Sequence, residues 1–306
     1  MIVDCYTHIW DSPSQVGLDP DSTAARPPMP AVAGGDDVAL DAGITRHLAA
    51  CEPVDRTIVL GFESAYLQAE IPNAQVAAYV RQHPEKLIGF AGIDPAVPRE
   101  AVGAMRRARQ ELGLRGISLA PAAQDFHPSA STAWRIYQAA TELEMPVLFH
   151  SGPYLARRSK MEYARPVLLD EVAREFPGLK IVIAHLGYPW VSEALVLLAK
   201  HDNVYADISW LLHQPWEAYQ ALLSAWQYGV MDNLLFGSGF PYTCAANCIA
   251  ALYSINHLVQ GTDLPTIPRE QLRSIVERDA LDLLGIEDGG GNGQRQRDRT
   301  VLDDEG

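Results

Sequence analysis

The sequence predicts a distorted (β/α)8 TIM barrel built as a single domain, and three observations support this fold class. Short apolar runs rich in Val and Ile alternate with longer helical patterns along the whole chain. Eight of these runs are bounded by Gly, Pro, Asn or Asp, as expected of strands buried on both faces of a parallel sheet. A length of 306 residues also suits such a barrel. A doubly wound open sheet is the alternative.

The strands and helices are predicted in strict alternation. The strands are Ile2–Tyr6, Thr57–Gly61, Leu87–Ile93, Gly116–Leu119, Val147–His150, Ile181–His185, Val204–Ile208 and Leu234–Gly237. Apolar residues at helical spacing mark two helices, one with Val76, Tyr79 and Val80 and one with Val102, Met105 and Leu112. Later helices are predicted near Thr132–Glu144, Pro166–Phe176, Val191–Lys200, Trp216–Trp226 and Ala245–Val259.

Two segments fall outside this repeat, so the barrel is assigned to residues 1–286. Asp11–Asp37 follows the first strand and is rich in Pro, Gly, Asp and Ser. Loops after barrel strands surround the active-site mouth, so this loop is either a lid or a solvated insertion. Residues 287–306 contain almost no apolar side chains and are predicted to be a disordered tail.

The composition narrows the classes of partner. A net charge of −14 argues against nucleic acid and anionic membranes as partners. No apolar run approaches the ~20 residues that span a bilayer, and the first residues do not resemble a signal peptide. Four cysteines in a chain of this length favour a reducing cytoplasm. Cys244 and Cys248, four residues apart, are interpreted as buried thiols rather than half of a metal site.

Polar residues gather where the predicted strands end. Tyr6 and His8 share one face of the first strand, because side chains repeat every two residues. His150 and His185 end the fifth and sixth strands, and Asp207 lies near the end of the seventh. A barrel brings the carboxyl ends of its strands to one mouth, so these side chains are expected to meet there.

Six runs occur in a characteristic order: "IVDCYTHIW", "LRGISLAP", "MPVLFHSG", "KIVIAHLG", "NVYADIS" and "NLLFGSGFPY". In these runs the chain resembles the amidohydrolase-related barrels, in particular the branch of aminocarboxymuconate-semialdehyde decarboxylase. That branch also contains resorcylate-type decarboxylases and lactone hydrolases. The resemblance extends from Met1 to about Ile286. It implies a barrel that is frequently a homodimer and that holds one divalent metal, usually zinc or manganese.

The resemblance is incomplete at the metal site. His8 and His150 match two of the family's metal ligands, whereas Tyr6 and Gly239 stand where the family has a histidine and an aspartate. His185 matches a histidine that acts beside the metal as an acid or base. A tyrosine binds metal only as a phenolate, which its pKa near ~10 disfavours. His8, His150 and an inward-turned His185 would supply the three ligands of a catalytic zinc site. If Gly239 is a single replacement, Gly239→Asp should raise metal affinity.

Other residues are candidates for a site that works with or without metal. His185 is predicted to be an acid or base, Asp207 to orient a histidine, and the Tyr6 hydroxyl to meet an oxyanion or orient a substrate. Arg157 and Arg158 are candidates for binding a substrate carboxylate, with solvation as the alternative. Aromatic walls for a planar or cyclic substrate are expected from Trp10, Trp190, Trp210 and Tyr242.

The leading hypothesis is an amidohydrolase-like enzyme that hydrolyses or decarboxylates a small carboxylated or cyclic molecule. A second hypothesis is a non-catalytic barrel that binds a ligand or a protein partner, since two ligand positions are substituted. A third is a metal-independent lactone hydrolase. The metal content separates an active metal site from the other two.

Overall fold

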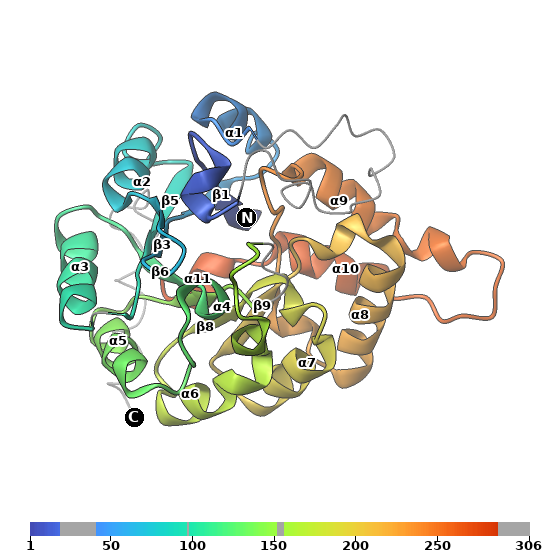
Figure 1. Ribbon diagram of the computed structural model, residues 1–306. Helices are drawn as coiled ribbons and strands as arrows, with labels where there is room; N and C mark the ends of the chain where they lie inside the picture. Colours follow the sequence, from blue (N-terminus) through green and yellow to red (C-terminus); the bar gives the residue numbers. More distant parts are fainter. Residues whose placement is uncertain (19–40, 97, 152–155, 287–306) are drawn as a thin grey trace, which may run out of the picture.

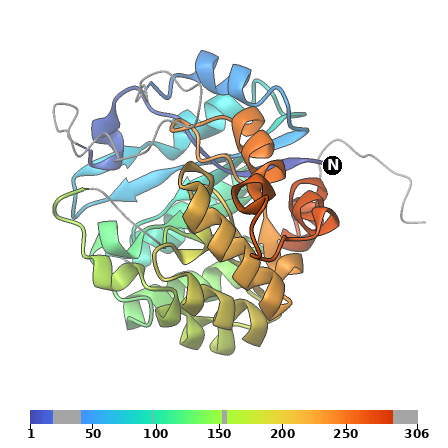
Figure 2. The same cartoon turned by 90° about the vertical axis from the view of Figure 1, so that its right-hand side faces the viewer.

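The computed structural model confirms the predicted barrel. It describes residues 1–18, 41–96, 98–151 and 156–286. Eight parallel strands form one sheet in the order β1-β2-β5-β6-β7-β8-β9-β10, and the helices lie outside this ring (Figure 1). Figure 2, turned by 90°, shows the same arrangement of helices around strands. The doubly wound alternative is wrong.

The barrel strands lie where the sequence places them. Their bounds are Val3–His8 (β1), Arg56–Leu60 (β2), Leu87–Gly92 (β5), Gly116–Leu119 (β6), Val147–Phe149 (β7), Ile181–Ile183 (β8), Val204–Asp207 (β9) and Leu234–Leu235 (β10). All of their residues are buried. A strand covered on both faces reads as a continuous apolar run, which is why periodicity could locate it.

The ring is closed by single hydrogen bonds rather than by a regular ladder. The backbone N–H of Cys5 donates to Phe236 O at 2.9 Å, and the N–H of Gly239 donates to Tyr6 O at 3.0 Å. The carboxylate of Asp4 accepts from the N–H of Ser238 at 2.8 Å. These contacts attach the first strand to the turn after the last one, so Tyr6 and Gly239 are held side by side.

Most of the helices cover the outer surface of the ring. They are α1 (Ile44–Ala50), α2 (Asn73–Val80), α3 (Pro98–Gln110), α4 (Pro121–Gln124), α5 (Ser131–Glu142), α6 (Asp170–Glu175), α7 (Val191–Lys200), α8 (Pro215–Tyr228), α9 (Ala245–Tyr253), α10 (Arg269–Glu277) and α11 (Ala280–Leu284). None of the helices in the described ranges is long and apolar enough to cross a membrane.

Several boundaries differ from the prediction. The predicted helix Ala245–Val259 is α9 followed by a separate 3-10 segment, Ile255–Val259. Most of the first half of Pro166–Phe176 is likewise a 3-10 turn. A small antiparallel hairpin, β3 (Phe62–Ser64) and β4 (Ala69–Ile71), follows β2. Its strands of three residues are too short to leave a periodic signal in the sequence.

The barrel interior is filled at the end opposite the site. Phe90 fills part of this space, and a Cβ on Gly116 would lie 2.5 Å from its ring, so glycine is required there. Helix α11 closes this end with Ala280, Leu281 and Leu284, which pack in the same cluster as the interior residues (Figure 1). The interior residues include Val3, Cys5, Ile58, Leu60, Ile88, Leu148, Val182 and Leu235.

The prediction of two buried thiols holds for one of the two cysteines. Cys248 is buried and donates to Ser238 O at 3.4 Å, whereas Cys244 is half-buried and precedes α9. Most of the predicted lid, residues 19–37, and the predicted tail, residues 287–306, lie outside the described residues. Both assignments stay predictions.

Candidate active site

Tyr6 lies at the centre of three histidines at the mouth of the barrel. The centre of its ring is 5.2 Å from that of His8, 5.4 Å from that of His150 and 4.6 Å from that of His185. The rings of His8 and His150 are 5.4 Å apart and nearly parallel. The structure therefore brings together side chains from the first, fifth and sixth barrel strands or their ends, as the barrel geometry requires.

His150 uses both of its ring nitrogens within this cluster. Its Nδ1 lies 2.7 Å from the Tyr6 hydroxyl, and its Nε2 lies 2.8 Å from the hydroxyl of Ser118 on β6. Both contacts are buried. His150 is therefore held between two hydroxyl groups, and neither nitrogen is available for another ligand while these bonds persist.

His8 keeps one nitrogen available. Its Nδ1 lies 3.2 Å from the carbonyl oxygen of Leu60 on the neighbouring strand. A carbonyl oxygen only accepts, so Nδ1 carries the proton and Nε2 presents a lone pair. Burial lowers the pKa of His8 to about 4, so the ring is neutral at pH 7.

His185 sits in a strained turn just after β8. Its φ of 58° and the φ of 47° at Leu186 are both in the left-handed region. Its Nδ1 lies 3.2 Å from the carbonyl oxygen and 2.8 Å from the hydroxyl of Ser209. The carbonyl again places the proton on Nδ1, which leaves the lone pair on Nε2. Burial lowers the pKa of His185 to about 3, so this imidazole is neutral as well.

Asp207 fixes the position of His185 through hydrogen bonds to the backbone and to Ser209. Its Oδ1 accepts from the backbone N–H of His185 at 3.2 Å and from that of Ser209 at 2.9 Å, and the Ser209 hydroxyl donates to the same oxygen. Its Oδ2 is buried and has no hydrogen-bond partner within the described part of the chain. Burial raises the pKa of Asp207 to about 7. Asp207 therefore reaches His185 through the backbone and through Ser209, not by direct contact with the ring.

The third imidazole, that of His150, also has a lowered pKa. Burial lowers this pKa well below its usual value, and the neighbouring His8 and His185 act in the same direction. Three neutral imidazoles and one phenol thus face one another. Perturbed groups grouped in this way are typical of functional sites.

Aromatic side chains join His8 to His185 along one side of the mouth. The ring centres are 6.3 Å apart for His8 and Trp10, 6.4 Å for Trp10 and Tyr242, 5.2 Å for Tyr242 and Trp210, and 6.1 Å for Trp210 and His185. Trp10 and Trp210 thus lie beside the histidines, as does Tyr242. Trp190 makes no such ring contact in the part of the chain that the structure describes.

The two arginines predicted to bind a substrate carboxylate lie at the surface. Arg157 and Arg158 are exposed, and the guanidinium of Arg158 lies 4.7 Å from the ring centre of Tyr66. Neither makes a contact with the histidines among the described residues. Binding of a substrate carboxylate by these arginines stays a prediction.

The metal that the family resemblance implies does not fit this donor set. The nitrogens of His150 are engaged by Tyr6 and Ser118, and Gly239 has no side chain. Across residues 1–18, 41–96, 98–151 and 156–286, no group of three or more His, Cys, Asp or Glu side chains is arranged to hold a metal ion. The predicted three-histidine site would require Tyr6 to release His150.

The backbone around Gly239 bears on the prediction that Gly239→Asp raises metal affinity. A Cβ on Gly239 would lie 3.4 Å from the backbone nitrogen of Trp210 and 3.6 Å from Ser209 Cβ, so there is room for it. The φ of 77° at this residue opposes any side chain, although Asp tolerates the left-handed region better than most residues. Metal binding through His150 would still require Tyr6 to release this histidine.

Sequence reasoning missed two serines of the site. Ser118 and Ser209 each hold a histidine. A usable signal exists for both, because Ser118 is a polar residue inside a buried strand and Ser209 follows Asp207 by two positions. Serines are common near strand ends, so this signal alone does not distinguish a functional role.

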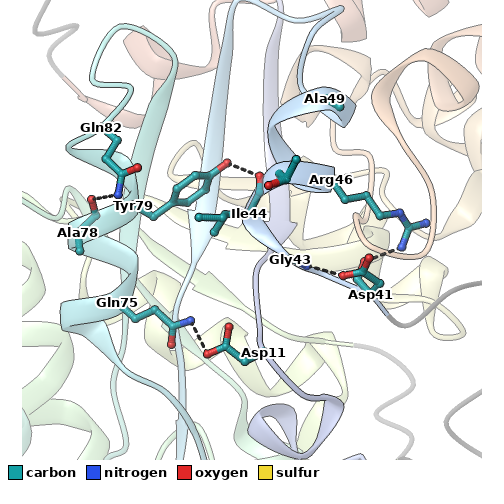
Figure 3. A pocket seen from close by; sticks show the side chains of 11 residues that line it. Asp11, Asp41, Gly43, Ile44, Arg46, Ala49, Gln75, Ala78, Tyr79 and Gln82 are labelled. Carbon is teal, nitrogen blue, oxygen red and sulfur yellow. Dashed lines mark hydrogen bonds between the residues drawn. The ribbon is translucent and has the colours of Figure 1, made fainter.

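A separate groove of about 780 Å³ lies outside the ring, between α1 and α2 (Figure 3). Tyr79 lines it, with its hydroxyl 2.9 Å from Nδ1 of the buried His47. The other nitrogen of His47 lies 2.8 Å from the Thr7 hydroxyl, on the opposite side of β1 from the site. These groups tie the helices to β1, and the charge of His8 lowers the pKa of His47 in addition to burial.

Comparisons with known proteins agree with the fold. A family model described as amidohydrolase matches residues 3–286. A TIM-barrel protein from Bordetella bronchiseptica superposes with a TM-score of 0.67 at 21% identity, covering 93% of this chain and 98% of that one. A dihydroxybenzoic acid decarboxylase from Polaromonas, solved with bound manganese and 2-nitroresorcinol, gives 0.63 at 15% identity, with coverage of 93% and 96%. A probable 2-pyrone-4,6-dicarboxylic acid hydrolase from Acinetobacter baumannii, solved with citric acid, gives 0.64 at 15%, with coverage of 93% and 99%.

Proposed function

The chain belongs to the amidohydrolase family, and from that premise we propose that it is a metal-independent hydrolase of small cyclic or carboxylated molecules, with His185 as general base. Decarboxylases and a hydrolase are both present among its structural neighbours. The orientation of His185 favours hydrolysis between these two reactions.

The observation that carries this proposal is the fixed tautomer of His185. The Ser209 carbonyl holds the proton on Nδ1, Nε2 makes no hydrogen bond with the residues that the structure describes, and His185 is 9% exposed. A neutral imidazole with an accessible lone pair can take a proton from water. Decarboxylation instead requires a proton donor for the carbon that loses CO₂. Because burial lowers the pKa of His185 to about 3, the ring is neutral at pH 7 and its Nε2 carries no proton to give at the start of such a reaction.

The hydrolytic step follows from this arrangement. The oxygen of a water molecule adds to the substrate carbonyl carbon while His185 Nε2 takes one of its protons, and the carbonyl π pair moves to oxygen. When that pair returns, the bond from carbon to the leaving oxygen breaks, and His185 delivers its proton to that oxygen. Asp207 and Ser209 stabilise the imidazolium between the two steps.

The substrate class follows from the walls of the site. Trp10, Tyr242 and Trp210 present aromatic surface between His8 and His185, which suits a planar ring. A lactone fused to or part of such a ring fits both this surface and the proposed chemistry. Arg157 and Arg158 remain candidates for a carboxylate on the same molecule. A homodimer and a cytoplasmic location also stay predictions.

Hydrolysis by metal-stripped protein tests the proposal. The protein is treated with a chelator, its metal content is measured by mass spectrometry, and it is assayed with aryl lactones such as dihydrocoumarin and with pyrone carboxylates. We expect turnover with well under one equivalent of metal and no gain from added manganese or zinc. Activity that depends on added metal would contradict the proposal. Absence of turnover across both classes would favour the non-catalytic barrel.

A further inference from the structure

We infer that His8 is a second acceptor for the attacking water, binding one of its O–H groups at Nε2 while His185 takes the proton of the other. This inference rests on the proposed hydrolysis, because it concerns the same water molecule. It gives His8, which matches a metal ligand of the family, the task of placing the nucleophile without a metal ion.

The hydrogen bonds of the two histidines leave the same atom of each ring as an acceptor. Nδ1 of His8 donates to Leu60 O at 3.2 Å. Nδ1 of His185 likewise donates to Ser209 O at 3.2 Å. A neutral ring with its proton on Nδ1 has a lone pair on Nε2. Neither Nε2 makes a hydrogen bond with the residues that the structure describes, and the two histidines are 7% and 9% exposed.

Both lone pairs are directed away from the wall of the barrel. Leu60 ends β2, the neighbour of β1, and Ser209 follows β9, the neighbour of β8, so each Nδ1 is bonded to the backbone of an adjacent strand or its end. The two nitrogens of an imidazole point away from each other, so each Nε2 points away from that backbone. Both rings pack on Tyr6, with centres 5.2 Å and 4.6 Å from that of the phenol. Besides burial, the charge of His8 lowers the pKa of His185, as expected of rings that lie close together.

The surroundings of the two rings give them different tasks. The Ser209 hydroxyl lies 2.8 Å from Nδ1 of His185 and donates to Asp207. A carboxyl group in this place stabilises the imidazolium that forms when His185 takes a proton. Nδ1 of His8 contacts the uncharged carbonyl of Leu60, and a positive charge on this buried ring would be costly. His8 therefore accepts a hydrogen bond and does not take the proton.

The two hydrogen bonds fix the water before it reacts. One O–H bond breaks and its proton moves to Nε2 of His185, while the oxygen forms its bond to the substrate carbonyl carbon. The other O–H bond stays intact. Its hydrogen bond to His8 passes from the water to the hydroxyl of the tetrahedral intermediate and then to the acid product, so His8 is neutral throughout. The benefit is orientation of the nucleophile.

A pair of substitutions at His8 tests the inference with dihydrocoumarin as substrate. In His8→Asn the amide N–H₂ keeps the bond to Leu60 O but the acceptor is lost, so kcat is expected to fall by about 10²-fold with little change in KM. The longer side chain of His8→Gln places its amide oxygen near the position of Nε2, so this variant should retain more of the wild-type kcat. The matched control is His83→Asn, which removes an imidazole beside Tyr79 outside the ring of strands and should leave kcat unchanged.

The position of the water gives a readout that does not depend on turnover. A crystal structure of the wild-type protein is expected to show one water about 3 Å from both Nε2 atoms, which requires these atoms to lie about 5 Å apart. Two Nε2 atoms that no single water can bridge would overturn the inference. So would a His8→Asn variant with wild-type kcat, or a His8→Gln variant as impaired as His8→Asn. If His185→Asn is inactive in these cases, the proposed hydrolysis stands. If His185→Asn also keeps the wild-type kcat, the proposed function fails as well.

Discussion

Replacing His185 by asparagine is expected to lower kcat by about 10²- to 10⁴-fold, the usual contribution of a general base. Asparagine is the appropriate replacement for two reasons. It tolerates the left-handed backbone better than most residues, and His185 has a φ of 58°. Its amide N–H₂ can also replace Nδ1–H in the bond to Ser209 O. The substitution therefore removes Nε2 while keeping the turn.

The measurement is steady-state hydrolysis of dihydrocoumarin at pH 7, with urea unfolding to confirm that the variant is folded. His257→Asn serves as the control, because His257 is exposed and makes no contact with the site. Its kcat should equal that of the wild type. A His185→Asn variant that keeps wild-type kcat would show that another group takes the proton from water.

The free energy of unfolding is expected to fall steeply as the pH is lowered from neutral toward 5. Burial lowers the pKa of five histidines, so each gains a proton on unfolding in this range. Burial raises the pKa of two carboxyl groups, and each loses a proton on unfolding. Near pH 5 the unfolded chain thus binds about three more protons, and stability falls by about 4 kcal/mol per pH unit. The groups are His8, His47, His150, His185 and His213, and Asp4 and Asp207.

Urea titrations at a series of pH values between 7 and 5 check this slope. His213 provides a matched variant, because its Nε2 is buried with no hydrogen-bond partner among the residues described by the structure, and burial lowers its pKa to about 4. His213→Leu should reduce the slope by the share of one proton, about 1.4 kcal/mol per pH unit. Stability that is constant or rises on acidification would mean that the buried carboxyl groups outweigh the histidines.

The barrel strands and the place of the site could be predicted because both depend on strong local signals. Strands buried on two faces leave continuous apolar runs, and closure of eight of them brings His8, His150 and His185 together. The hairpin β3–β4 and helix α1 escaped prediction. Three-residue strands and a helix of seven residues are defined by packing more than by periodicity.

The bonding inside the site could not be predicted. The sequence places Tyr6 beside the histidines, but the 2.7 Å contact with His150 depends on the length and direction of one side chain. The left-handed turn includes Leu186, a residue with no preference for that conformation, and it is held by bonds that His185 makes with Asp207 and Ser209. Such features arise from tertiary contacts between separate strands, so they became visible only with the fold.

The proposal that this histidine cluster works without a metal ion, with Tyr6 at its centre, is tested most directly by anomalous diffraction from crystals soaked in manganese chloride. We expect no anomalous peak among His8, His150 and His185, with the Tyr6 hydroxyl at hydrogen-bonding distance from His150 Nδ1. A manganese peak bonded to His8 and His150, with Tyr6 turned aside or itself coordinating the ion, would contradict the account.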